Sequence, residues 1–79
     1  MPRFHFHLRT YVEARDEEGL EFRDLDAAKA SAVTNARHLM SDDIKNRGSI
    51  CLSHTIEIAD PDGVRLHLTR YGDCVDVEP

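Results

Sequence analysis

The stretch DLDAAKASAVTNARHLMSDDIKNRG, from Asp24 to Gly48, decides the fold, because it has the length and pattern of one long amphipathic helix. At about 100° per residue its apolar side chains fall within one arc. These side chains are Leu25, Ala28, Ala32, Val33, Ala36, Leu39, Met40 and Ile44. Asp24 can cap the free N–H groups of the first turn, and Gly48 can adopt the left-handed conformation that ends a helix. We therefore predict one helix over residues 25–47 with one buried face.

Alternating apolar and polar residues on both sides of this segment predict strands. Before it, Phe4, Phe6 and Leu8 alternate with polar residues in a strand that we expect to reach Val12, and a shorter strand follows over residues 20–22. After it, two strands over residues 55–59 and 64–69 meet at the turn sequence Asp60-Pro61-Asp62-Gly63. In these two strands we expect the core side to carry Ile56, Ile58, Val64, Leu66 and Leu68.

The order of elements is thus β-β-α-β-β, which predicts an α+β fold with one helix on a three- to four-stranded antiparallel sheet. We expect a single domain over residues 1–79, in which residues 70–79 form a short edge strand or a loose tail. One helix covers only one face of a sheet. The other face must meet water or a partner.

Composition narrows the possible partners. The formal net charge of −5 repels phosphate backbones and anionic membranes, so nucleic acid is an unlikely partner and no membrane is expected. No stretch approaches the roughly 20 apolar residues of a membrane span. We expect a cytoplasmic protein in which Cys51 and Cys74 stay reduced. A chain of 79 residues buries a small core, which favours a homodimer or a protein partner.

Several short motifs together resemble a family of short bacterial proteins classed as a domain of unknown function. They are the opening Pro2-Arg3-Phe4-His5-Phe6-His7, the acidic turn with Gly19-Leu20, the helix start Asp24-Leu25-Asp26-Ala27-Ala28, and Ile56-Glu57-Ile58 leading to Asp62-Gly63. The family's opening is Pro-Arg-aromatic-x-Phe-His. The chain departs from the family at Arg70-Tyr71, where relatives often carry a proline and an aromatic residue. The resemblance implies a cytoplasmic bacterial protein and carries no activity or catalytic residue.

Polar residues of the predicted strands define a candidate interaction face on the sheet side without a helix. We expect this face to carry His5, His7, Arg9, Glu57, Arg65 and His67. The leading hypothesis is a noncatalytic protein-interaction or self-association module that uses this face or a sheet edge. The alternative is a metal site formed by His5, His7 and His67, since imidazoles are common ligands of zinc and nickel.

The histidines and Cys51 also fit two other roles. His7 can instead lock the first strand through a hydrogen bond to a neighbouring backbone group or carboxylate. For catalysis, Cys51 or Ser53 lies close in sequence to His54, but no glycine-framed nucleophile elbow is present. No glycine-rich phosphate loop occurs either. We therefore expect neither an enzyme nor a cofactor.

Overall fold

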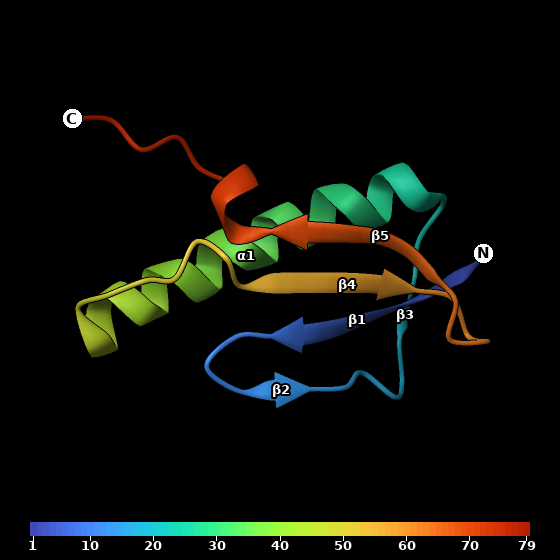
Figure 1. The fold of residues 1–79 in the computed structure, drawn as a ribbon. Coiled ribbons are helices and arrows are strands. Elements are labelled where there is room, and N and C mark those ends of the chain that lie inside the picture. Colours follow the sequence, from blue (N-terminus) through green and yellow to red (C-terminus); the bar gives the residue numbers. More distant parts are fainter.

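A computed structural model describes residues 1–79 as one helix lying across one face of an antiparallel sheet (Figure 1). The elements are β1 (Arg3–Arg9), β2 (Glu13–Ala14), β3 (Leu20–Glu21), α1 (Leu25–Arg47), β4 (Thr55–Ala59), β5 (Arg65–Arg70) and the 3-10 helix η1 (Tyr71–Asp73). The predicted α+β class and the order of strands around a single helix are confirmed. No helix of the chain is both long enough and apolar enough to cross a membrane.

The sheet has the order β2-β1-β4-β5, and β3 also pairs with β1. The predicted first strand is too long, because the N–H of Thr10 donates to the carbonyl of Val12 and turns the chain there. The predicted second strand forms as β3 (Leu20–Glu21), while β2 (Glu13–Ala14) is an additional short strand. Both pair with β1, and residues 15–19 lie between them.

The helix begins and ends where its sequence predicts. Oδ1 of Asp24 accepts from the N–H of Ala27 at 2.8 Å, and Gly48 adopts φ 73° while its N–H donates to Ile44. Ala28, Ala32, Ala36 and Met40 form the buried stripe of α1. Ile44 belongs to the predicted stripe but is 56% exposed. The last turns of α1 extend past the sheet, which explains this exposure (Figure 1).

The inner face of β5 is the reverse of the prediction. The turn itself forms as expected, with Gly63 at φ 88° and the carboxylate of Asp60 accepting from Asp62 and Val64. However, Ile56 pairs with Thr69 and Ile58 pairs with His67. Residues paired across strands point to the same face, so Thr69 and His67 lie on the helix side. Leu68 therefore shares the opposite face with its partner Glu57.

The C-terminal segment adds no strand to the sheet. Tyr71 and Cys74 are buried at η1, and residues 74–79 hold no regular element, so the short edge strand predicted as one alternative for residues 70–79 does not form. The core is small: 12 of the 79 residues are buried. Ile56, Ile58 and Tyr71 are its largest fully buried side chains. β5 is left as the last strand of the sheet.

Candidate functional site

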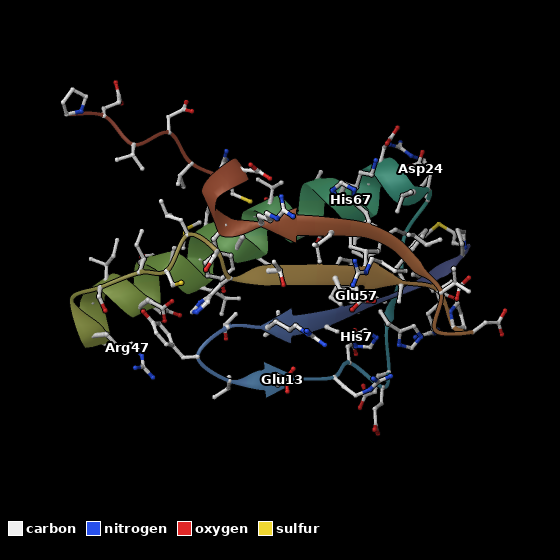
Figure 2. All side chains as sticks on the ribbon, viewed as in Figure 1. His7, Glu13, Asp24, Arg47, Glu57 and His67 are labelled. Carbon is white, nitrogen blue, oxygen red and sulfur yellow. The ribbon has the colours of Figure 1, made fainter.

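Five of the six residues predicted for the interaction face lie on the sheet face away from the helix, which we call the outer face. His7 pairs with Glu57, Arg9 with Thr55 and His5 with Ala59, and Arg65 reaches Glu57 at 3.5 Å. Figure 2 shows His7 and Glu57 on the neighbouring strands β1 and β4. His67 does not join them, because its partner Ile58 is fully buried beneath the helix.

The three histidines of the predicted metal site do not come together in the structure. His67 projects from the face opposite to that of His5 and His7, so the three imidazoles cannot converge on one ion. No three histidine, cysteine, aspartate or glutamate side chains of the chain meet in a group able to hold a metal ion. The error has one cause: the face of β5 depends on its register with β4, and the residue alternation alone does not determine that register.

Asp16, which the sequence indicates only as part of an acidic run, is the centre of the polar structure beside β1. Its Oδ1 accepts from the N–H of Gly19 at 2.9 Å and of Glu18 at 3.2 Å, and its Oδ2 accepts from the N–H of Phe6 at 3.1 Å. Burial acts to raise the pKa of Asp16, but these hydrogen bonds and the nearby His5 outweigh it and lower the pKa below 3.8. The carboxylate is therefore ionised at neutral pH.

The carboxylate of Asp16 closes a gap in the edge of the sheet. Leu8 pairs with Ala14 of β2, and Phe4 pairs with Leu20 of β3, so the N–H of Phe6 lies between the two short strands without a backbone partner. Asp16 supplies the missing acceptor. An aspartate three residues before a glycine is a turn signal, and this is the local sequence feature that could have identified it.

The two histidines of β1 both form hydrogen bonds with the backbone of Asp16: His5 is the donor, and His7 is the acceptor. Nδ1 of His5 lies 2.8 Å from the Asp16 carbonyl, which can only accept, so Nδ1 of His5 donates. The N–H of Asp16 donates to Nδ1 of His7 at 3.0 Å, so Nδ1 of His7 is unprotonated. A neutral His7 then carries its proton on Nε2. The predicted hydrogen bond between His7 and a neighbouring backbone group is confirmed, and it ties β1 to Asp16.

Arg3 and Gly19 complete this arrangement. Nη1 of Arg3 donates to the carbonyls of Glu18 at 2.8 Å and Gly19 at 3.2 Å. Gly19 has φ 71°, and a Cβ there would lie 2.9 Å from the carbonyl oxygen of Phe4. Arg3, Phe6 and His7 of the opening motif thus hold residues 15–19, which we call the Asp16 loop, against β1.

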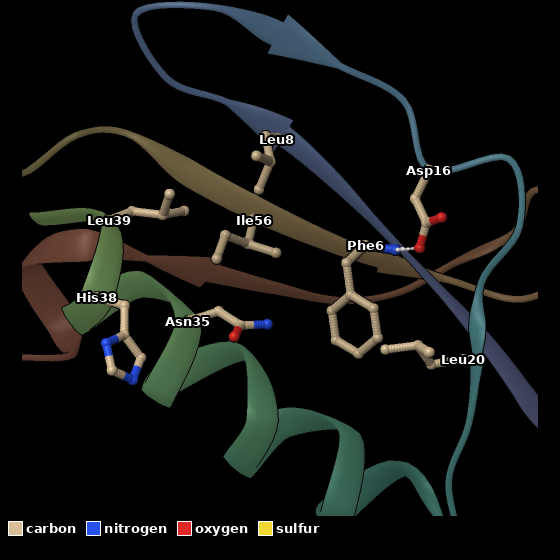
Figure 3. A pocket seen from close by; sticks show the side chains of 8 residues that line it. All are labelled: Phe6, Leu8, Asp16, Leu20, Asn35, His38, Leu39 and Ile56. Carbon is tan, nitrogen blue, oxygen red and sulfur yellow. Dashed lines mark hydrogen bonds between the residues drawn. The ribbon is translucent and has the colours of Figure 1, made fainter. Parts of the chain in front are cut away.

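An apolar groove lies on the helix side of β1. It has a volume of about 340 Å³ and is open because α1 packs on β4, β5 and η1. Figure 3 shows its lining, which consists of Phe6, Leu8, Asp16, Leu20, Asn35, His38, Leu39 and Ile56. The carboxylate of Asp16 already accepts a hydrogen bond from the N–H of Phe6, and Asn35 and His38 are exposed at the helix surface. The groove is therefore mainly apolar, and its polar side chains do not converge on a common position.

β5 forms one edge of the sheet, and the two-residue strands β2 and β3 form the other. The N–H of Tyr71 donates to His54 in the ladder with β4, and successive strand residues turn their backbone groups to alternate sides. The N–H groups of Leu68 and Arg70 therefore point away from β4. The thiol of Cys74 donates to the Arg70 carbonyl at 3.2 Å. No strand pairs with this edge of β5.

The residues considered for catalysis do not assemble. Sγ of Cys51 lies 3.1 Å from Oγ of Ser53, whereas the ring of His54 stacks edge-on between Tyr11 and Tyr71 at 4.6 and 5.5 Å. Nδ1 of His54 is buried and has no hydrogen-bond partner. A nucleophile and its base need a direct hydrogen bond or one through water. Cys51, Ser53 and His54 do not form that pair in this structure.

Comparison with known proteins assigns the chain to a protein family. A family model described as "Domain of unknown function (DUF6894)" matches residues 3–72, which include every strand and the helix. No curated protein and no solved structure matches the chain at a significant level. The match agrees with the resemblance carried by the opening motif and the turn residues. The chain belongs to the DUF6894 family, a domain of unknown function.

Proposed function

We propose that the protein is a noncatalytic interaction module that forms a homodimer by pairing the β5 edges of two copies. The observation that carries this proposal is the orientation of β5. Val64 and Leu66 are 57% and 39% exposed, and Leu68 faces away from the helix. An apolar edge strand with unpaired backbone groups is a favourable site for strand addition.

The two edges of the sheet differ in how many unpaired backbone groups they offer to a second chain. Along β1, the short strands β2 and β3 and the Asp16 carboxylate occupy the edge, and Phe6 has no free N–H. Along β5, the N–H groups of Leu68 and Arg70 have no partner. β2 and β3 have only two residues each, whereas β5 has six, so β5 offers the longer edge to an added strand.

A second copy is a suitable occupant because the edge is complementary to itself. Two β5 strands related by a twofold axis run antiparallel, and each then offers the other the same unpaired groups and apolar side chains. The small core gives such pairing an energetic benefit, since burial of Val64, Leu66 and Leu68 adds apolar area that one chain does not provide. The two free cysteines agree with a reducing compartment such as the cytoplasm.

Sedimentation velocity over a range of concentrations tests the dimer. Leu68→Pro removes an N–H that points away from β4, so it should block edge pairing while leaving the ladder with β4 in place. Leu68→Ala keeps the N–H and removes the side chain. We expect a concentration-dependent dimer for the wild type, a weaker dimer for Leu68→Ala and a monomer for folded Leu68→Pro. A wild-type monomer at millimolar concentration would refute the proposal.

A further inference from the structure

We propose that the Asp16 loop, which is two residues longer than a continuous strand requires, blocks the β1 side of the sheet against strand addition, so that assembly through sheet edges stops at two copies. The limit of two copies rests on the proposed β5 dimer, whereas the block itself does not. The proposal is carried by the register of the two short strands, by the hydrogen bonds of the loop and by its exposed charges.

The two short strands pair with β1 in registers that differ by two residues. Ala14 of β2 lies opposite Leu8, and Leu20 of β3 lies opposite Phe4. Three residues of β1 separate these two pairs, whereas the Asp16 loop places five residues between them. Extra residues make an edge strand bulge away from its partner and interrupt the ladder of hydrogen bonds. β2, the Asp16 loop and β3 thus form one edge strand that is broken by a two-residue insertion.

Most backbone groups of the loop already have partners. The N–H and the carbonyl of Asp16 form hydrogen bonds with the rings of the two β1 histidines. The N–H groups of Glu18 and Gly19 donate to the Asp16 carboxylate, and the carbonyls of Glu18 and Gly19 accept from Arg3. Strand addition needs unpaired N–H and C=O groups at alternate residues along an edge. Asp16, Glu18 and Gly19 offer none.

The short strands on either side of the loop offer one residue each to an added strand. Backbone groups alternate in direction along a strand, so one residue of each two-residue strand bonds to β1 and the other points outward. The outward residues are Glu13 and Glu21, because the bond from the N–H of Phe6 to Asp16 shows which residues of β1 face this edge. Between them the loop presents exposed charged side chains, which discourage strand pairing. These side chains are Arg15, Glu17 and Glu18.

The β5 edge has the opposite character. β5 has six residues, and the N–H groups of Leu68 and Arg70 have no partner. A sheet with one open edge can pair with one further copy, which closes the assembly as a twofold dimer. A sheet with two open edges could continue to add copies. The insertion in the Asp16 loop therefore decides between a dimer and open-ended growth.

Deletion of Glu17 and Glu18 from the full chain tests the block. The deletion removes the two extra residues, so that β2 and β3 can pair with β1 in a single register. We expect sedimentation velocity to show species larger than a dimer whose size increases with concentration, whereas the wild type stops at the dimer. The matched control carries Glu17→Ser and Glu18→Ser, which removes the same two charges and keeps the length of the loop. It should sediment as the wild type does.

A second edge variant separates the block from the β5 dimer. With Leu68→Pro added to close the β5 edge, the deletion variant should still form a dimer through its new edge, whereas Leu68→Pro alone should be a monomer. If the wild type is itself a monomer, the β5 dimer fails, but the deletion variant should then dimerise through the new edge. The two proposals therefore fail in different ways.

Two results would overturn the block. A deletion variant that is folded and keeps the oligomeric state of the wild type would show that the insertion does not limit assembly. Higher oligomers of the serine control would assign the block to charge alone. If the deletion variant does not fold, hydrogen exchange of the wild type decides. The amides of Glu13 and Glu21 should exchange at rates independent of protein concentration, and protection that rises with concentration would show that this edge pairs.

Discussion

The backbone N–H of Asp16 lies 3.0 Å from Nδ1 of His7, and the carbonyl of the same residue lies 2.8 Å from Nδ1 of His5. One peptide segment therefore sets two histidines in opposite tautomers. The two rings stack with centroids 6.3 Å apart. The Asp16 loop thus determines both how the edge of β1 is closed and which nitrogen atoms reach the outer face.

The two tautomers can be observed directly. We expect His7 to carry its proton on Nε2 and His5 on Nδ1 at a pH at which both rings are neutral, because each Nδ1 has a backbone partner of fixed donor or acceptor type. Long-range ¹H–¹⁵N correlation spectra of the imidazoles distinguish the two forms. A proton on Nδ1 of His7 is incompatible with the hydrogen bond from Asp16.

Asp16→Asn should lower the free energy of unfolding by about 2 kcal/mol at neutral pH, because asparagine keeps only one acceptor oxygen and its NH2 group cannot accept the N–H groups that the second carboxylate oxygen binds. The pKa of the folded state lies below 3.8, so this contribution is complete above about that pH and is lost as the pH falls through the folded pKa. Urea unfolding at several pH values measures both effects. Asp42→Asn, at an exposed position of α1, is the control. Parallel acid profiles for the wild type and Asp16→Asn would contradict this assignment.

Gly19→Ala should destabilise the fold more than Gly48→Ala. Both glycines have positive φ, 71° and 73°, but a Cβ at Gly19 meets Arg3 and Phe4 at 2.9 Å, whereas nothing lies within 4 Å at Gly48. The backbone conformation costs each variant about 1 kcal/mol, and the steric clash adds to that cost only at Gly19. Thermal and urea unfolding of the two variants give the difference. Equal losses would mean that the Asp16 loop moves away from β1 without cost.

Tyr71→Phe should remove a source of alkaline instability. The hydroxyl of Tyr71 is buried without a partner, and burial, followed by the negative charges of Asp43 and Cys74, raises its pKa to about 12. A raised folded pKa gives stability that is present below the unfolded value of 10 and is lost as the pH rises through about 12.

At neutral pH, Tyr71→Phe should be as stable as the wild type or more stable by about 1 kcal/mol, since it deletes an unsatisfied buried hydroxyl. Unfolding measured between pH 7 and 12 tests this, with Tyr11→Phe at a 41% exposed position as the control. A large loss of stability at neutral pH would reveal a hydrogen bond to the Tyr71 hydroxyl.

Local signals explain which parts of the fold were predictable. Asp24 and Gly48 act within one turn of the helix ends, and both ends of α1 were predicted correctly. The face of β5 depends on non-local pairing, because a register irregularity between Ile58 and Ala59 shifts the strand after the turn. That shift moved His67 to the helix side and Leu68 to the outer face.

The candidate site was predictable in part for the same reason. His5, His7 and Arg9 alternate along one strand, so their shared face follows from the period of two. The role of Asp16 depends on contacts with Phe6 and His7, which are 10 and 9 residues away along the chain. A residue that acts through such contacts has no periodic pattern around it. Only its spacing to Gly19 was informative.

The central claim, that β5 edges pair in a homodimer, is tested most directly at the amide of Leu68. This N–H points away from β4 and has no partner within the chain. Hydrogen exchange at increasing protein concentration should show the Leu68 amide becoming protected in step with the dimer fraction, while the amide of Ile56 in β4 stays protected throughout. A Leu68 amide that exchanges freely when the protein is dimeric would contradict the claim.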